Sequence, residues 1–201
     1  MGIIHRIIRR CVYKYLAEEK KGNDTLKECI MGKKVDIQSP YVISHPELIE
    51  VGERTIISPY ARIQVYPELT GNNGYRLYIG KNCFIGYRVS ILVGASIEIG
   101  DNVAIASDVS IISENHGMNP ESVVPYKEQE LVVKPIKIGD NCWIGDKTVI
   151  TAGVIIGDNC IIGAGSVVTK AIPSMSIAAG NPARVIKQYD KEKHEWIQVG
   201  K

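Results

Sequence analysis

An aliphatic residue recurs at every sixth position through much of this 201-residue chain, and this spacing restricts the folds it can adopt. Four series keep the spacing: Ile138, Ile144, Ile150, Ile156, Ile162 and Val168; Val93, Ile99, Ile105 and Ile111; Ile79, Ile85 and Ile91; Val51, Ile57 and Ile63. A period of six matches neither the 3.6-residue turn of a helix nor the alternation of one long strand. It matches a chain that makes a short strand, turns a corner and repeats.

The residues between the aliphatic positions are typical of corners. Glycine follows many of the aliphatics, and asparagine stands two residues after that glycine in four repeats: Asn82, Asn102, Asn141 and Asn159. Both residue types tolerate a positive φ. Three such sides make a coil of about 18 residues, and coils stack as parallel strands about 4.8 Å apart. We therefore expect a triangular prism of about five coils with the aliphatics inside.

The core must be built from branched aliphatics, since the chain has one Phe and two Trp. Cys83, Cys142 and Cys160 each stand two residues before a repeat aliphatic, in a slot that elsewhere holds Val, Thr or Ser. They are therefore predicted to be small interior residues. Cys142 and Cys160 would stack on neighbouring coils, but a reducing cytosol disfavours a disulfide between them.

Charge and hydropathy exclude several classes of protein. The chain has 24 Lys and Arg against 22 Asp and Glu, a formal charge of +2, which does not favour a nucleic-acid partner. No apolar run approaches the roughly 20 residues that span a bilayer, and the N-terminus lacks a signal-peptide pattern. We expect a cytoplasmic protein.

The segment "IGDNCWIGDKTVITAGVIIGDNCIIGAGSVVTK", followed by "AAGNPARVIK", closely resembles the hexapeptide-repeat acyltransferases. The galactoside, maltose and polysaccharide O-acetyltransferases are the most similar, and the resemblance covers residues 49–187. It implies an all-β fold, a left-handed parallel β-helix. It also implies a homotrimer with active sites between subunits and acetyl-CoA in the intersubunit groove.

The repeat is interrupted between Ile111 and Ile138, so residues 112–137 are predicted to form a loop thrown out from one corner. Long loops in compact repeats are often functional. This loop contains His116 in "HGMNP", which resembles the context of the family's catalytic histidine. Acetyl transfer to a hydroxyl needs a base, and an imidazole can act as one at neutral pH. We predict that His116 is this base in a direct transfer; whether Glu114 or Asn115 orients it stays open.

The other histidines do not support a metal site. His5 lies in a predicted helix, His45 precedes a proline and His194 lies in a charged tail. The related γ-type carbonic anhydrases bind zinc through three histidines, whereas here no second histidine lies near His116 in the repeats. We predict no metal.

The resemblance implies six positions that bind acetyl-CoA. Asp146 and Ala164 would contact the pantetheine arm, although the family usually has a small residue where Asp146 stands. Thr169 would lie at the nucleotide end, with Lys170 and Arg184 as a basic pair facing the phosphates. Trp143 would form a wall of the groove near the thioester. Each of these residues has an alternative role as an ordinary corner or surface residue.

The predicted function is acetyl-CoA-dependent O-acetylation of a sugar hydroxyl, in a surface polysaccharide or its precursor. N-acetylation of an amino sugar, O-acetylation of serine and a non-catalytic scaffold remain alternatives. The acceptor site is not identified. Tyr87 could stack on a sugar, and Arg88 could bind an acidic sugar or lie over the coil surface.

The two ends of the chain have different patterns. Residues 1–22 are predicted to form a basic amphipathic helix, and 23–48 a linker to the repeat domain at 49–187. Peripheral membrane contact through residues 1–20 is one interpretation of this helix, but a cap on the first coil is favoured. Residues 188–201 are predicted to form a short helical tail.

Overall fold

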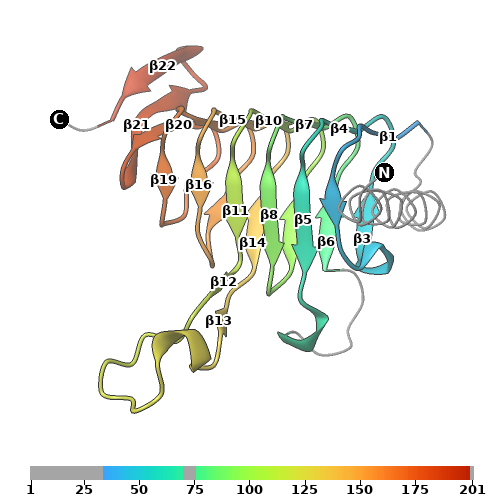
Figure 1. The fold of residues 1–201 in the computed structure, drawn as a ribbon. Coiled ribbons are helices and arrows are strands. Elements are labelled where there is room, and N and C mark those ends of the chain that lie inside the picture. The colour runs from blue at the N-terminus through green and yellow to red at the C-terminus, as the bar shows by residue number, and fades with distance from the viewer. Residues whose placement is uncertain (1–33, 70–75, 200–201) are drawn as a thin grey trace, which may run out of the picture.

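The computed structural model describes residues 34–69 and 76–199, and these residues form a left-handed parallel β-helix (Figure 1). Its three faces are sheets of nine, six and five strands. The nine-stranded face contains β1 (Asp36–Ile37), β4 (Ile56–Ile57), β7 (Phe84–Ile85), β10 (Ala104–Ile105), β15 (Trp143–Ile144), β18 (Ile161–Ile162), β20 (Ser176–Gly180), β21 (Ala183–Asp190) and β22 (Glu195–Gln198). The six-stranded face contains β2 (Val42–Ile43), β5 (Arg62–Val65), β8 (Ser90–Val93), β11 (Ser110–Ile112), β16 (Val149–Ile150) and β19 (Val167–Val168).

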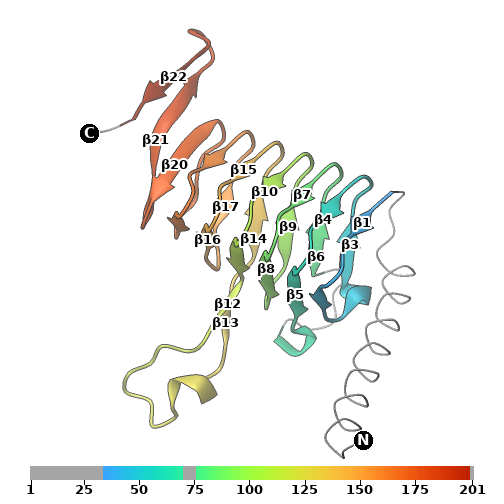
Figure 2. The same ribbon diagram turned by 45° about the horizontal axis from the view of Figure 1, so that its top comes forward.

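The five-stranded face contains β3 (Ile49–Val51), β6 (Leu77–Ile79), β9 (Ile97–Ile99), β14 (Ile136–Ile138) and β17 (Ile155–Ile156). The remaining described elements are the strands β12 (Glu114–Asn115) and β13 (Val132–Val133) and the 3₁₀ turns η1 (Pro46–Leu48), η2 (Pro67–Leu69) and η3 (Tyr126–Glu128). Figure 2 shows the stacked coils, with the loop that carries β12 and β13 leaving one edge of the prism.

The repeat aliphatics fill the interior in register. Ile57, Ile85, Ile105, Ile144 and Ile162 pair from coil to coil, and each is at most 1% exposed. Because β side chains alternate, the residue before each of them points outward. The core of the prism is thus a ladder of aliphatic on aliphatic, as the repeat predicted.

The predicted cysteine positions are confirmed for the three cysteines in the described residues. Cys83, Cys142 and Cys160 are buried and free. The Sγ atoms of Cys83 and Cys142 donate to the carbonyl oxygens of Gly100 and Gly157, each at 3.1 Å. Burial raises the pKa of the Cys83 thiol, and the hydrogen bond with Cys160, together with burial, raises the pKa of Cys142.

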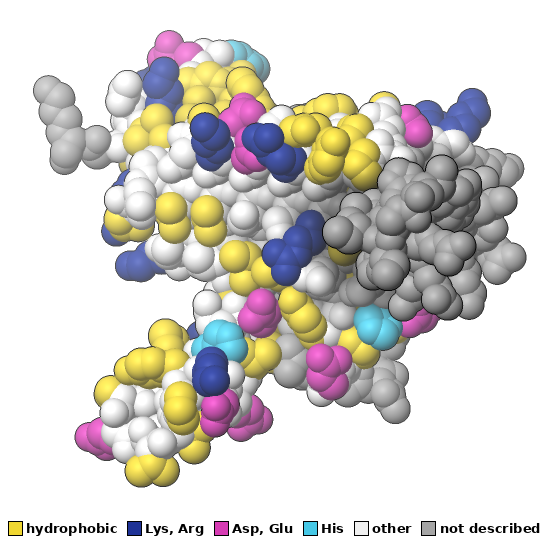
Figure 3. All heavy atoms as spheres, in the orientation of Figure 1, with side chains coloured by type: hydrophobic (Ala, Val, Ile, Leu, Met, Phe, Trp, Pro, Cys, Tyr) yellow, Lys and Arg dark blue, Asp and Glu magenta, His cyan; other side chains and the backbone are white. Residues whose placement is uncertain are grey.

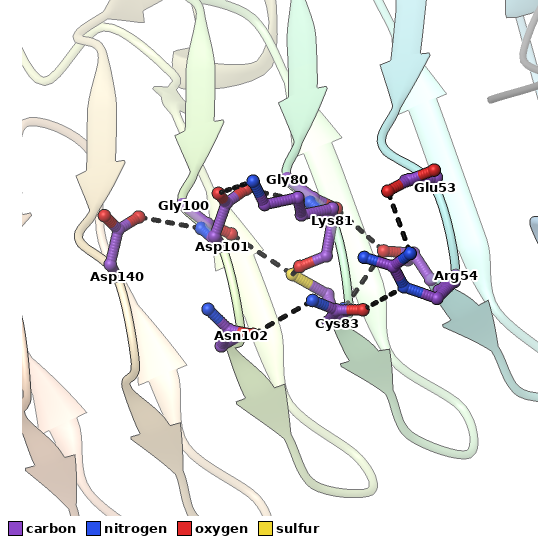
Figure 4. Close-up of polar contacts among 11 residues, drawn as sticks. Glu53, Arg54, Gly80, Lys81, Cys83, Gly100, Asp101, Asn102 and Asp140 are labelled. Atoms are coloured by element: carbon purple, nitrogen blue, oxygen red, sulfur yellow. Dashed lines mark hydrogen bonds and ion pairs between the residues drawn. The ribbon is translucent and has the colours of Figure 1, made fainter. Parts of the chain in front are cut away.

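The corners of the prism form three edges. The asparagine edge, between the five-stranded and nine-stranded faces, carries Asn82, Asn102, Asn141 and Asn159, all with φ between 54° and 57°. The backbone N–H of Asp101 donates to Oδ1 of Asp140 at 2.8 Å, and Lys81 N–H donates to Oδ1 of Asp101 at 2.9 Å (Figure 4). Each coil therefore satisfies a corner amide of the coil before it.

The tyrosine edge lies between the nine-stranded and six-stranded faces and carries Tyr60 and Tyr87. The loop edge lies between the six-stranded and five-stranded faces, and the long loop leaves the prism there. These two edges carry most of the predicted site residues, so they are described in the next section.

The first coil begins earlier than predicted. Residues 23–48 were expected to be a linker, but β1 and β2 already pair in parallel with β4 and β5. Ile37 and Ile43 keep the six-residue spacing, and η1 then adds two residues before the series resumes at Val51. That small insertion hid the first coil in the sequence.

The predicted C-terminal helix over 188–201 is wrong. β21 pairs antiparallel with β20, the last strand of the nine-stranded face, and β22 pairs antiparallel with β21. The turn between them is held by Oδ1 of Asp190, which accepts from the N–H groups of Glu192 and Lys193. Tyr189 and Trp196 pack edge to face across the hairpin, with centroids 5.4 Å apart. The open edge of the sheet thus selects an extended chain over a helix.

The predicted helix over residues 1–22 lies outside the described residues. Within the described part of the chain, the structure contains no helix of the length and apolarity that crossing a bilayer would require.

Candidate active site

The loop that interrupts the repeat begins with a buried serine at the loop edge. Ser113 follows β11, is 0% exposed and lies in the slot that Val65 and Val93 fill in earlier coils. Its hydroxyl accepts from the N–H groups of Gly94 and Ala95, both at 3.0 Å, and lies 2.8 Å from the Ala95 carbonyl oxygen, to which it donates. One side chain therefore ties the start of the loop to the corner of the preceding coil.

Sequence analysis missed Ser113. The available signal was a polar residue two positions after Ile111, where the equivalent positions after Ile63 and Ile91 hold valine. A hydroxyl in an otherwise apolar interior slot needs hydrogen-bond partners, and here the corner backbone supplies them.

The stem of the loop is a two-stranded antiparallel ribbon. β12 pairs with β13, with Glu114 opposite Val133 and Asn115 opposite Val132. The N–H of Lys134 donates to the carbonyl of Ser113 at 3.0 Å, which closes the base of the stem. The observed excursion is thus slightly shorter than the predicted one of residues 112–137.

His116 is the first residue after β12, and its side chain is exposed. Within the described residues its imidazole makes no hydrogen bond or ion pair, so neither Glu114 nor Asn115 orients the ring here. The ring is therefore accessible to a substrate, and the backbone of the loop sets the position from which it projects.

Beyond His116 the loop presents hydrophobic side chains to solvent, and Figure 3 shows them gathered on this projecting segment. Met118 is 73% exposed, Val123 is 100% exposed and Tyr126 is 57% exposed. Such a concentration of exposed apolar side chains on one arm is typical of a contact surface.

Asp146 and Ala164 lie one above the other on the tyrosine edge. The N–H of Gly165 donates to the carbonyl of Asp146 at 2.7 Å, and both Asp146 and Ala164 are exposed. The Oδ1 atom of Asp146 accepts from the backbone N–H of Ser107 at 3.2 Å. The carboxylate at this position therefore stabilises the corner of the coil before it.

Trp143 and Arg184 belong to the nine-stranded face, which borders the same edge. Trp143 points outward from β15 and is 56% exposed. Arg184 lies on β21, opposite Ala179, and is exposed. Both side chains are therefore exposed on the face that borders the tyrosine edge.

Thr169 and Lys170 follow β19 and lie on the loop edge, where both are exposed. The loop leaves the same edge after β11, two strands away in the six-stranded face. That face separates His116, Thr169 and Lys170 from Asp146 and Ala164. The structure therefore distributes the predicted site residues over two edges of one chain.

A groove of about 380 Å³ lies at the base of the loop, on the outer side of the five-stranded face. Its walls include Lys134 and Pro135 from the end of the loop, Lys137 from β14, and Gly153 and Ile155 from the next coil. Lys137 forms an ion pair of 3.5 Å with Glu98. The groove thus opens beside the stem that carries His116.

Tyr87 and Arg88 on the tyrosine edge are part of a local cluster. Arg88 makes two hydrogen bonds to Asp108, of 2.6 and 2.8 Å, and its guanidinium lies 4.8 Å from the centroid of the Tyr87 ring. The hydrogen bond from Arg88 lowers the pKa of Asp108. Tyr60 packs edge to face on Tyr87, at 5.2 Å between centroids. Arg88 is therefore already engaged within the chain.

Two family models match the chain. "Hexapeptide repeat of succinyl-transferase" matches residues 76–112, and "Bacterial transferase hexapeptide (six repeats)" matches residues 135–170. The galactoside O-acetyltransferase of Escherichia coli (strain K12) is 39% identical over 160 residues, which cover 77% of each chain. The chain belongs to the hexapeptide-repeat acetyltransferase family.

Solved structures agree with this assignment. A maltose O-acetyltransferase from Clostridium difficile 630 is 32% identical, with a TM-score of 0.55, and the match covers 87% of this chain and 78% of that chain. A hexapeptide-repeat acetyltransferase from Vibrio cholerae O1 biovar eltor, complexed with acetyl coenzyme A, is 25% identical, with a TM-score of 0.59 over 86% and 79% of the two chains. This family member is thus an enzyme, an acetyltransferase.

In this acetyltransferase the loop lies between the two matched segments. The family models therefore describe parts of the prism and leave residues 113–134 unmatched. Over the described ranges, 34–69 and 76–199, no group of three or more His, Cys, Asp or Glu side chains is arranged to hold a metal ion.

Proposed function

We propose that this acetyltransferase moves an acetyl group from acetyl-CoA to a sugar hydroxyl of a surface polysaccharide or its precursor, with His116 as the general base. The observation that carries the proposal is the exposed imidazole of His116 at the end of the loop stem. The similarity to acetyltransferases named for galactosides and maltose supports a sugar acceptor.

The proposed reaction is a direct transfer. The imidazole of His116 takes the proton from the acceptor hydroxyl as its oxygen bonds to the thioester carbonyl carbon. The C–S bond then breaks, and the imidazolium returns the proton to the leaving thiolate of CoA. The products are the acetyl ester and free CoA, so no nucleophile on the enzyme is needed.

Exposed side chains on both edges are suited to binding the acetyl donor, acetyl-CoA. Lys170 and Arg184 are exposed cations that would face its phosphates, and Asp146 and Ala164 offer corner backbone to its pantetheine arm. Trp143 would lie near the thioester and Thr169 near the nucleotide.

The separation of these residues supports a homotrimer as part of the proposal. His116 leaves the loop edge, whereas Asp146 and Ala164 lie on the tyrosine edge, on the other side of the six-stranded face. A donor that contacts both groups would therefore lie between two copies of the chain. The hydrophobic side chains of the loop, Met118 and Val123, would then be covered by the neighbouring subunit.

Release of the CoA thiol in the presence of candidate acceptors tests the proposal. The panel should contain neutral sugars, amino sugars and serine, so that O-acetylation and N-acetylation are separated by product analysis. His116→Ala should reduce kcat/KM by about 10²- to 10⁴-fold, the usual contribution of a general base. His194→Ala, in the exposed C-terminal turn, is the matched control and should retain full activity.

Unchanged acetyl transfer by His116→Ala would remove the histidine from the mechanism. If only amino sugars or only serine were acetylated, the proposal that the acceptor is a sugar hydroxyl would be wrong.

A further inference from the structure

The backbone of the loop sets the position from which the His116 ring projects, since within the described residues no side chain hydrogen-bonds to that ring. On the N-terminal side, the pairing of Asn115 with Val132 fixes the chain. On the C-terminal side, no strand lies between His116 and η3, so residues 117–119 are held by a contact outside the sheets.

That contact is the side-chain amide of Gln129. Its Oε1 atom accepts from the N–H of Asn119 at 3.0 Å, and its Nε2 donates to the carbonyl of Asn119 at 3.0 Å. The Nε2 group also donates to the carbonyl of Val124 at 3.0 Å. One side chain thus joins the returning segment, on which Gln129 lies, to Asn119 in the segment after His116 and to Val124.

Gly117 shows how closely these segments pack. A Cβ atom added to Gly117 would lie 2.7 Å from Cβ of Gln129 and 3.0 Å from the carbonyl oxygen of Glu130. Gln129 is half-buried, whereas its neighbours Glu128 and Glu130 are exposed. The residue directly after His116 is therefore packed against the same glutamine that binds Asn119.

We propose that Gln129 is a positioning residue for acetyl transfer, holding the backbone on the C-terminal side of His116 so that the imidazole points at the reacting atoms. This inference rests on the proposed role of His116. The side chain at position 129 must both accept from the N–H of Asn119 and donate to the carbonyls of Asn119 and Val124, and a side-chain amide can do both. A carboxylate would lack the donors, and a thioether of similar size would lack the donors and offer only a weak acceptor.

Gln129→Met tests this inference, because methionine preserves most of the volume against Gly117 and removes the three hydrogen bonds. We expect kcat to fall by about 10- to 100-fold, since small displacements of a catalytic group have effects of this order, with KM for acetyl-CoA changed less than about 3-fold. Gln198→Met, at an exposed position of β22, is the matched control and should leave both constants unchanged.

A double-mutant cycle with His116→Ala decides whether Gln129 acts through the histidine. In the His116→Ala background, Gln129→Met should cause no further loss of kcat, because the group that it positions is absent. The thermal transition of the prism should be the same in all four proteins, which separates positioning from unfolding.

Additive losses in the cycle, or wild-type kcat in Gln129→Met, would overturn the inference alone. Full activity in His116→Ala would overturn the proposed function first, and this inference with it. The two failures are therefore distinguishable within one experiment.

Discussion

The prism and the loop are stabilised in opposite ways. In the prism each coil repeats the previous one, and the same aliphatic position is buried in every coil, from Ile57 to Ile162. In the loop no position repeats, and single polar side chains, Ser113 at its base and Gln129 at its centre, hold the backbone. Stability is thus spread over many equivalent residues in the prism, whereas the geometry of the loop depends on very few.

This difference is consistent with the proposed place of the base in the loop. Coils in parallel register bury their aliphatic residues and leave short corners. The loop that carries His116 projects beyond the coils (Figures 1 and 2). Changes in the loop should therefore alter activity, and changes inside the prism should alter stability.

Removing the loop should have the largest effect. Replacing residues 114–133 with one glycine would leave three residues between Ser113 and Ile136, the same number as between Val93 and Ile97 one coil earlier. We expect acetyl transfer to fall by about 10³-fold or more, because the proposed base and its positioning would both be lost. The melting temperature, followed by circular dichroism, should change by less than about 4 °C. Cooperative unfolding at a much lower temperature would contradict the separation of the two regions.

The next largest effect is expected inside the prism, where two adjacent isoleucines provide a matched pair. Ile156 is 0% exposed and Ile155 is 54% exposed. Ile156→Ala should lower the free energy of unfolding by about 2–5 kcal/mol through lost burial and a cavity. Ile155→Ala should change it by less than about 0.5 kcal/mol, measured by denaturant titration. A large effect at Ile155 would mean that this face is covered in solution.

Ser113 lies where the loop meets the prism, and the substitution Ser113→Ala should have a smaller effect. The N–H groups of Gly94 and Ala95 would lose their acceptor, at a cost of about 1–3 kcal/mol in the free energy of unfolding. Acetyl transfer should also fall, because the base of the loop is released. Ser110→Ala, at a half-buried outward position of the same strand, is the control and should change neither quantity. Loss of stability without loss of activity would show that the anchor does not affect His116.

The smallest effect is expected from Arg88→Gln. The ion pair of Arg88 with Asp108 is exposed, and such pairs contribute little to stability. We expect an unchanged melting temperature and a kcat/KM within about 2-fold of the wild-type value for a neutral sugar. A selective rise in KM for an acidic sugar would instead place Arg88 in the acceptor site.

Several features of the molecule could be predicted from local patterns. The buried series from Val51 to Val168 and the positive-φ asparagines follow from spacing and residue type, because each coil repeats the same local constraints. The start of the first coil at β1 was missed, since η1 shifts the spacing between Ile43 and Val51. The C-terminal hairpin was also missed, because its strands depend on the open edge of β20 and not on the charge pattern of the tail.

The amino-acid sequence by itself determined the triangular coil, the inward aliphatics and the point where a loop must leave, because these depend on contacts that recur at a fixed interval. Only the tertiary structure decided that Asp146 and Ala164 lie on a different edge from His116, and that Ser113 and Gln129 hold the loop. The contacts of Ser113 and Gln129 join segments at unequal separations, from the 10 residues between Asn119 and Gln129 to the 19 between Gly94 and Ser113. A contact that occurs once, between side chain and distant backbone, leaves no period in the sequence to detect.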